Sequence, residues 1–341
     1  MAVTVNTFLG VNNKEAPEAL LDIDKGRAKT FMPSGVNVDV TDAYKLRRRF
    51  GVTRLLTGNW HSLWAHVSGS YGFGVKDGAV YRLYPQGDNV AATAVGLSVS
   101  SRRMVFSDVS SGDVHFSDGQ RHWVYSRGAV EELTQAGTYD RTEQFADQDE
   151  DAAFYDAFPP VFEMTWAFGR LWGADADVVW YSPAFFPRRC KADTDYIAQP
   201  DVTLLKAVSD GVYVGTEEAV WFYAGTDPKK MRPTQVCGEG AVKGTPVAVT
   251  ADKFKIDGAF GPAVVWESVR GKVLGLSGGR VVYLTDAAVS YAPGELGASL
   301  LREANGLTQH LSAFPATSER ASNMRATDVA EATIVRNGTI I

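Results

Sequence analysis

The acidic segment ADQDEDAAFYD, residues 146–156, contains side chains that could hold a metal ion. Three aspartates recur there at every second residue, as the first ligands of a calcium-binding loop do: Asp147, Asp149 and Asp151. Such a loop continues with a turn glycine and a closing bidentate glutamate, but Ala152 and Phe158 stand at those positions. We therefore expect a solvated acidic loop without a metal. The loop could also meet a basic surface of a neighbouring subunit.

The histidines and cysteines do not form a recognisable metal site. His61 and His66 are the only histidines within five residues of each other, and on an extended strand they would point to opposite faces. Cys190 and Cys237 lack metal-ligand spacing, so we expect two reduced, partly buried thiols. Because no nucleophile-elbow, zinc-protease, dinucleotide or P-loop motif is present either, we expect no catalytic residue, metal or cofactor.

Carboxylates that could cleave a glycosidic bond are available in the sequence, Glu163 and Asp175 among them. That chemistry needs two carboxyl groups about 5 to 9 Å apart, a separation that a linear sequence does not show. The turn-rich segment 110–123 lacks the order of residues of an Asp-box. A carbohydrate-binding or glycan-degrading protein therefore remains the alternative to a non-enzymatic one.

Basic residues gather in the stretch VNVDVTDAYKLRRRFGVTRL, residues 36–55. On a strand alternate residues share a face, so three of them point one way: Lys45, Arg47 and Arg49. Arg48 would share the other face with Leu46 and Phe50, and a guanidinium there needs carboxylate partners. Asp39 or Asp42 across the hairpin could supply one. We expect Arg48 to be structural and the other three to contact a subunit, DNA or only water.

Composition limits the possible partners. The chain has 341 residues, a formal net charge of −6 and a pI near 5.5, which argues against general coating of DNA. Hydrophobic residues make up 45% and charged residues 22%, as in ordinary globular proteins. No run of about 18 apolar residues predicts a membrane span, and the first residues do not resemble an export signal. We expect an intracellular product.

Internal similarity indicates the fold class. Five segments each read as three short apolar strands joined by polar turns such as KDG, SDG and SGG, typical of an antiparallel meander: residues 62–85, 103–128, 164–184, 204–225 and 264–286. Their starts lie roughly 40 or 60 residues apart, close to the blade repeat of a β-propeller. We predict an all-β, propeller-like array of three- to four-stranded meanders. A two-sheet sandwich or a pair of barrels is the competing interpretation.

The remaining segments complete one predicted domain, residues 1–341. Residues 1–35 are expected to form an N-terminal arm with a short helix within 14–28, and residues 297–305 suggest a second helix. Residues 131–160 form an acidic insert. Both ends of the chain have strand character, and the C-terminal segment 289–341 is expected to close the propeller, or to be an appendage or a degraded last blade.

Several short sequences resemble a family of virion proteins of tailed bacteriophages. They are GVNN (10–13), NVDVTDAYKLRRRFGVT (37–53), HSLWA (61–65) and IVRNG (334–338), the last preceded by DVAEA. Tyr44 and Phe50 depart from the family, where similar sequences tend to have a turn glycine and a proline. In plan these proteins are similar to the propeller-built tail hub or nozzle proteins of short-tailed phages.

The resemblance implies a non-enzymatic structural component of a phage tail or connector. Such a protein forms a ring of its own copies, for example a hexamer, around or near the DNA exit channel. It implies other tail or connector proteins as partners, transient contact with genomic DNA, assembly in the host cytoplasm and a final place in the virion tail. An acidic chain with isolated basic positions is compatible with a channel that must release DNA, because each phosphate contact adds affinity.

Overall fold

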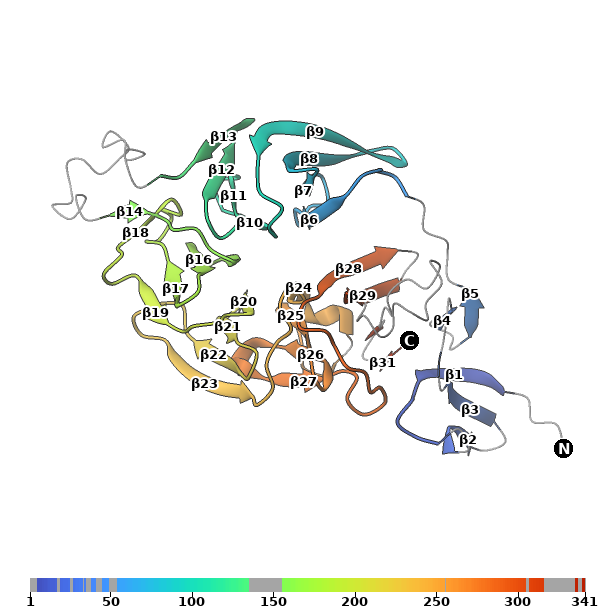
Figure 1. Cartoon of the computed structure of the whole chain (residues 1–341). Helices are drawn as coiled ribbons and strands as arrows, with labels where there is room; N and C mark the ends of the chain where they lie inside the picture. Colours follow the sequence, from blue (N-terminus) through green and yellow to red (C-terminus); the bar gives the residue numbers. More distant parts are fainter. Residues whose placement is uncertain are drawn as a thin grey trace. The chain divides into compact units, whose positions relative to one another are not determined.

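The computed structural model shows an all-β chain (Figure 1). It describes residues 5–16, 19–24, 27–32, 34, 38–40, 45–48, 54–134, 155–254, 256–304, 307–315, 335–336 and 339–340. The chain divides into two compact units, residues 52–205 and residues 1–51 with 206–341. Each unit is described by itself.

The unit formed by residues 52–205 contains three antiparallel four-stranded sheets. The first has the order β6 (Trp60–Ala65), β7 (Gly72–Lys76), β8 (Ala79–Gln86) and β9 (Asn89–Ser98). The second has β10 (Val105–Asp108), β11 (Val114–Ser117), β12 (His122–Ser126) and β13 (Ala129–Glu132). The third has β15 (Glu163–Ala167), β16 (Arg170–Ala174), β17 (Val178–Tyr181) and β19 (Tyr196–Ala198). The short strands β14 (Asp156–Ala157) and β18 (Arg189–Cys190) pair separately.

The other unit contains three more four-stranded sheets. One consists of β20 (Leu204–Val208), β21 (Gly211–Gly215), β22 (Val220–Ala224) and β23 (Arg232–Cys237), with the first residues of β20 at the unit boundary. The next consists of β24 (Val247–Thr250), β25 (Pro262–Ser268), β26 (Gly271–Gly275) and β27 (Val281–Tyr283), with the short 3-10 helices η3 (Ala251–Phe254) and η4 (Ser277–Gly279). The last consists of β28 (Ala298–Ala304), β29 (Leu307–Ala313), β30 (Val335–Arg336) and β31 (Thr339–Ile340).

Two small sheets at the N-terminal end belong to none of these four-stranded sheets. One has the order β1 (Val5–Val11), β3 (Arg27–Met32) and β2 (Leu21–Asp24), and the other pairs β4 (Val38–Val40) with β5 (Leu46–Arg48). β1 runs parallel to β3, whereas β2 and β3 form an antiparallel pair. The N-terminal end therefore forms its own β structure beside the repeated sheets.

Tight two-residue turns explain why the meanders fold back so sharply. In the β7–β8 hairpin Lys76 pairs with Ala79, and Asp77 and Gly78 between them have φ angles of 50° and 77°. Positive φ at both positions defines the turn type that matches the twist of paired strands, and Asp-Gly is a favoured sequence for it. The KDG sequence therefore predicted this hairpin correctly.

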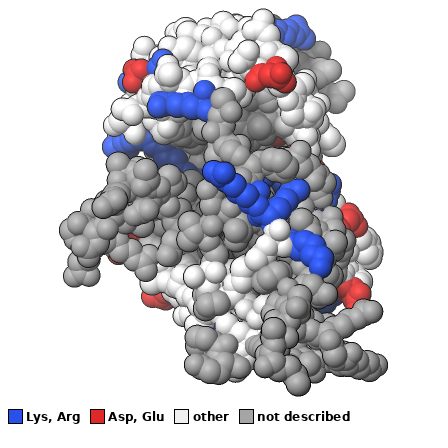
Figure 2. Space-filling model, turned by 90° about the vertical axis from the view of Figure 1, so that its right-hand side faces the viewer, with Lys and Arg blue, Asp and Glu red and all other residues white. Residues whose placement is uncertain are grey.

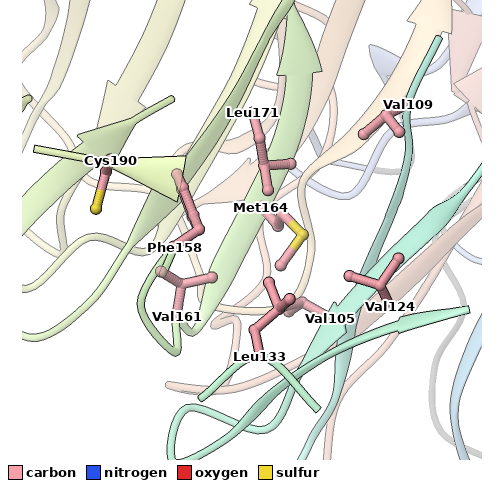
Figure 3. Close-up of a cluster of buried hydrophobic side chains, with 9 residues drawn as sticks. All are labelled: Val105, Val109, Val124, Leu133, Phe158, Val161, Met164, Leu171 and Cys190. Atoms are coloured by element: carbon pink, nitrogen blue, oxygen red, sulfur yellow. The ribbon is translucent and has the colours of Figure 1, made fainter. Parts of the chain in front are cut away.

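Two hydrophobic clusters lie in the unit formed by residues 52–205. Side chains from β10, β12, β15 and β16 meet in the cluster of Figure 3, in which Val105, Val124, Met164 and Leu171 are buried. The second cluster is aromatic and includes the fully buried Phe73 and Phe116. Fully burying such a side chain contributes about 1.5–3 kcal/mol. These clusters hold neighbouring sheets of the unit against one another.

The fold-class prediction is confirmed. All five predicted meanders contain three consecutive antiparallel strands, and each belongs to a four-stranded sheet of the kind that forms a propeller blade. One strand of each sheet lies outside the predicted segments: β24 precedes the last segment, and β9, β13, β19 and β23 follow the others. β13 and β19 are short, largely exposed and carry little apolar alternation.

Both helix predictions are wrong. Residues 21–24 and 27–32 form strands β2 and β3, and residues 298–304 form strand β28. The sequence LDID in fact alternates apolar and acidic residues, which is the period of a strand. The first helix was predicted from the apolar residues Ala19, Leu20, Leu21 and Ile23, which also fit a strand that begins at Leu21. No helix in the described part of the chain is long and apolar enough to cross a membrane.

The two ends of the chain lie in different sheets. β1 joins the N-terminal sheet, whereas β30 and β31 complete the sheet begun by β28 and β29. β31 nevertheless lies next to β1 (Figure 1). Among the described residues, the C-terminal segment forms a four-stranded sheet without an N-terminal strand.

The predicted acidic insert, residues 131–160, includes the end of β13 and the short strand β14. Its residues 135–154 lie outside the described part.

Candidate functional site

The basic hairpin consists of β4 and β5, in which Asp39 lies opposite Arg47 and Val38 lies opposite Arg48. Lys45 and Arg48 are exposed, whereas Arg47 is half-buried. The structure therefore does not agree with a packed Arg48, since the half-buried arginine of this strand is Arg47. The effect of Arg48 on stability stays a prediction.

The remaining predicted site residues are not in the described part of the chain: Arg49, Asp42, Asp147, Asp149 and Asp151. Their roles stay predictions. Figure 2 shows one face of the molecule, on which both Lys or Arg and Asp or Glu side chains are visible. Within the hairpin, Lys45 and Arg48 are exposed cations.

The two residues Asn13 and Lys14, which follow β1, bind to the loop after β27. The Asn13 side chain donates to the carbonyl of Ser290 at 2.9 Å and accepts from the Ser290 N–H at 2.7 Å. The Asn13 N–H also donates to the Ala288 carbonyl at 2.9 Å. Lys14 Nζ pairs with Asp286 Oδ1 at 3.1 Å. These contacts tie the end of the N-terminal sheet to the sheet of β24–β27.

Next to these contacts, Arg270 forms hydrogen bonds with two acidic residues. Its Nε and Nη2 donate to Asp286 Oδ2, and its Nη1 donates to Glu239 Oε1 at 3.1 Å. The guanidinium lies 4.1 Å from the centroid of the Tyr283 ring, and the Tyr283 hydroxyl donates to Glu239 Oε2 at 2.7 Å. Hydrogen bonds from Arg270 and Lys14 lower the pKa of Asp286. Asp286 therefore links Arg270 with the N-terminal segment.

A buried polar network lies between the sheet of β24–β27 and the sheet of β28–β31. Glu267 on β25 and Lys272 on β26 face each other across the hairpin and form a fully buried ion pair. Ser312 and His310 on β29 complete it, and Lys272 Nζ donates to Ser312 Oγ at 2.8 Å and to His310 Nδ1 at 3.1 Å. Each proton of the ammonium group thus has an acceptor.

The Glu267 carboxylate is equally well satisfied. Its Oε1 accepts from Lys272 and Ser312, and its Oε2 accepts from the Tyr291 hydroxyl. Because His310 Nδ1 accepts from Lys272, the imidazole is neutral with its proton on Nε2, a buried atom for which the described residues provide no hydrogen-bond acceptor. Burial lowers the pKa of Lys272, and burial beside Lys272 lowers the pKa of His310.

This network braces two sheets rather than forming a reaction centre. Glu267, Lys272 and His310 are fully buried, so a substrate has no access to them. A buried pair of charges is tolerated only when hydrogen bonds satisfy both partners, as they do here. The sequence analysis missed the network. A glutamate and a lysine one pair before the hairpin turn, next to Ser268 and Gly271, were a detectable signal. His310 and Ser312 come from a distant part of the chain.

A second buried polar pair lies in the other unit. His122 Nδ1 donates to the Pro159 carbonyl at 3.0 Å, so its Nε2 accepts from His115 Nδ1, also at 3.0 Å. Both rings are therefore neutral. Burial lowers the pKa of His122 to about 4 and that of His115 well below its usual value. Such rings pack β11 and β12 against the segment around Pro159.

The two carboxylates that the sequence offered for glycoside cleavage, Glu163 and Asp175, form other interactions in the structure. The buried Glu163 carboxylate pairs with Arg103 at 2.6 Å, and Asp175 accepts from Trp180 Nε1 at 2.6 Å. Burial raises the pKa of Cys190 to about 12 and also raises that of Cys237. Within the described residues no group of three or more His, Cys, Asp or Glu could hold a metal ion.

His61 and His66 are not brought together at one site. His61 Nδ1 contacts Ser62 Oγ at 2.9 Å, whereas His66 Nδ1 contacts Ser68 Oγ at 2.7 Å and His66 Nε2 lies 3.5 Å from Asp108. This order of Ser, His and Asp resembles a catalytic arrangement. The Ser68 N–H donates to the same His66 nitrogen at 3.1 Å, however, so the contact is that of a local turn.

No protein-family model matches this chain, and no curated protein matches it. Among solved structures, the extracellular domain of a B. thetaiotaomicron protein described as a one component system matches 88% of this chain at 7% identity and a TM-score of 0.49. This chain spans only 41% of that protein. The virginiamycin B lyase of Staphylococcus aureus matches 82% of this chain and 93% of its own at 9% identity and a TM-score of 0.44. At this similarity the neighbours do not identify what this chain binds or does.

Proposed function

We propose that this chain is a non-enzymatic structural component of a bacteriophage tail or connector. In this role it forms a ring of its own copies, such as a hexamer, around or near the DNA exit channel and contacts other tail proteins. Assembly takes place in the host cytoplasm, and the mature protein lies in the virion tail. The sequence resemblance to tail hub and nozzle proteins motivates the proposal.

The observation that carries the proposal is the pair of small N-terminal sheets outside the four-stranded sheets. Asn13 and Lys14 attach this region to the loop at residues 286–290, and the β4–β5 hairpin exposes Lys45 and Arg48. An attached but separate element with exposed cations is suited to contact an acidic surface of the next subunit, because opposite charges steer and orient association. A ring repeats that contact around its axis.

Electron microscopy and mass spectrometry of purified virions test the role directly. We expect the protein in the tail of intact particles, and we expect the purified chain to form closed rings alone or with its neighbouring tail proteins. A chain that stays monomeric with those proteins and is absent from virions would rule out the proposal.

Charge reversal tests the proposed contact. The variant Lys45→Glu/Arg48→Glu should keep the fold but lose ring assembly. The matched control is Lys229→Glu/Lys230→Glu, which reverses two exposed cations of the loop between β22 and β23 and should still assemble. Equal assembly of both variants would show that the hairpin is not the contact. Circular dichroism checks that each variant is folded.

A further inference from the structure

A cavity of about 550 Å³ lies in the unit formed by residues 52–205. Its lining comes from strands β8, β9 and β12 and the turn that follows β12, and includes Arg82, Tyr84, Thr93, Val95, Tyr125 and Gly128. The volume falls within the range of small-molecule sites, roughly 300–1,000 Å³. Aromatic rings, hydroxyl groups and one guanidinium therefore surround a space of ligand size.

Arg82 is held in this cavity by aromatic side chains instead of by an acid. Its guanidinium carbon lies 5.1 Å from the ring centroid of Tyr71 and 5.7 Å from that of Tyr125. Nη1 donates to the Tyr125 hydroxyl at 3.3 Å. Within the described part of the chain, Arg82 forms no ion pair, and its buried Nε has no hydrogen-bond partner. A guanidinium that two rings orient and that has no acidic partner is suited to an anionic oxygen, which would approach its terminal nitrogen atoms because Nε is buried.

The charges around the cavity indicate what kind of anion fits. Arg82 is the only charged residue among the described residues of the lining. The nearby acid Asp108, whose charge raises the pKa of Tyr71, lies 3.5 Å from His66 Nε2 instead. One positive charge balances a carboxylate better than a doubly charged phosphate. A carboxylate also matches the planar fork of an arginine.

The neutral part of the lining suits a sugar ring. The hydroxyls of Tyr84 and Thr93 lie 3.3 Å apart, and Tyr84 is 39% exposed, so both can reach ligand hydroxyl groups. Tyrosine rings provide apolar faces with a polar tip, which suits the apolar and hydroxylated sides of a sugar. We propose that this cavity binds a carboxylated sugar residue, with Arg82 contacting the carboxylate and Tyr84 and Thr93 contacting hydroxyl groups. This binding site does not depend on the proposed tail function.

Calorimetric titration of the full chain with four probes tests the proposal. D-glucuronate has the carboxylate and the sugar ring, D-glucose lacks the charge, acetate lacks the ring, and inorganic phosphate is a different anion. We expect glucuronate to bind at least about tenfold more tightly than each of the others, since a charge-assisted hydrogen bond and the ring contacts add together. No binding of glucuronate, or equal or tighter binding of glucose, acetate or phosphate, would overturn it.

Two matched variants locate the binding. Thr93 is exposed, so Thr93→Glu should fold normally while placing a negative charge opposite the ligand carboxylate. Both Thr93→Glu and Thr93→Gln remove the threonine hydroxyl and have the same size, so they differ only in charge, and Thr93→Glu should bind glucuronate about tenfold or more weakly than Thr93→Gln does. Arg82→Gln should abolish the preference for glucuronate over glucose. If Thr93→Glu binds glucuronate as tightly as Thr93→Gln, the site is elsewhere and the proposal is wrong.

Discussion

Two junctions between neighbouring sheets of this protein contain opposite kinds of side chains, apolar in one and polar in the other. In the unit of residues 52–205, Phe73 of β7 lies 5.9 Å from Phe106 and 6.2 Å from Phe116, measured between ring centroids, so the two sheets meet through stacked aromatic rings. In the other unit, Glu267 and Lys272 meet His310 and Ser312 of the C-terminal sheet through hydrogen bonds.

The difference predicts how each junction responds to change. Contacts between apolar rings are non-directional and allow repacking when the volume is kept. A buried network of charges and hydrogen bonds fails as a unit, because removing one partner leaves another buried and unsatisfied. The polar junction should therefore be the more sensitive one, and it also specifies more closely which segment packs there.

Removal of the buried ammonium should have the largest effect. Lys272→Met leaves the Glu267 carboxylate buried without its counter-charge, and we expect the free energy of unfolding to fall by about 3–5 kcal/mol, measured by urea denaturation. The double variant Lys272→Met/Glu267→Gln removes both charges and should be more stable than the single variant. A single variant that is as stable as the double one would contradict the idea that the network acts as a unit.

Acid should weaken the polar junction through His310 and the unit of residues 52–205 through His122, because both rings are buried and neutral. The pKa of His122 is about 4 when folded and 6.5 for the free side chain, so the unfolded state binds more protons between these values. Stability is complete above pH 6.5 and falls as the pH drops toward 4, by on the order of 3 kcal/mol from His122. His310, whose pKa is also lowered, adds to the slope.

The His122→Asn variant separates this acid effect from others. Its free energy of unfolding, measured by denaturation at several pH values, should change less steeply between pH 6.5 and 4 than that of the unchanged protein. A parallel pH profile of the two proteins would assign the acid sensitivity to other groups.

A conservative change in the aromatic junction should have a moderate effect. Phe116→Leu keeps an apolar side chain at a fully buried position and should lower the free energy of unfolding by about 1–2 kcal/mol. The control is Phe260→Leu, because Phe260 is 76% exposed and should change stability by less than about 0.5 kcal/mol. A loss at Phe116 as large as that of Lys272→Met would remove the proposed contrast between the junctions.

The smallest effect is expected at an exposed ion pair in the same unit as the buried network. Lys253 Nζ lies 3.2 Å from Glu303 Oε2, and both side chains are at least two-fifths exposed. Solvent screens such a pair, so Lys253→Ala should change the free energy of unfolding by no more than about 0.5 kcal/mol, with even less change at high salt. If Lys253→Ala lowered the free energy of unfolding by several kcal/mol, an exposed ion pair would contribute as much as the buried pair Glu267–Lys272, and the contrast between them would be wrong.

The sequence by itself determined the repeated meanders. Alternating apolar residues specify strands with one or two packed faces, and turns such as Asp77–Gly78 specify the point of reversal, so both signals are local. Local signals failed at residues 21–24, where two neighbouring leucines suggested a helix although LDID alternates as a strand. Pairing with β3 decides the strand there, and that pairing is not written in the segment itself.

Only the tertiary structure decided the sites. Strand pairing places Asp39 opposite Arg47 and Val38 opposite Arg48, and the fold leaves Arg48 exposed and Arg47 half-buried. Residues far apart in the sequence create the rest: His310 comes 38 residues after Lys272, and Tyr125 comes 43 residues after Arg82. The residue types of a sequence show which side chains are able to interact with one another. The packing of one sheet on the next selects which of them do, because it alone sets distance and burial.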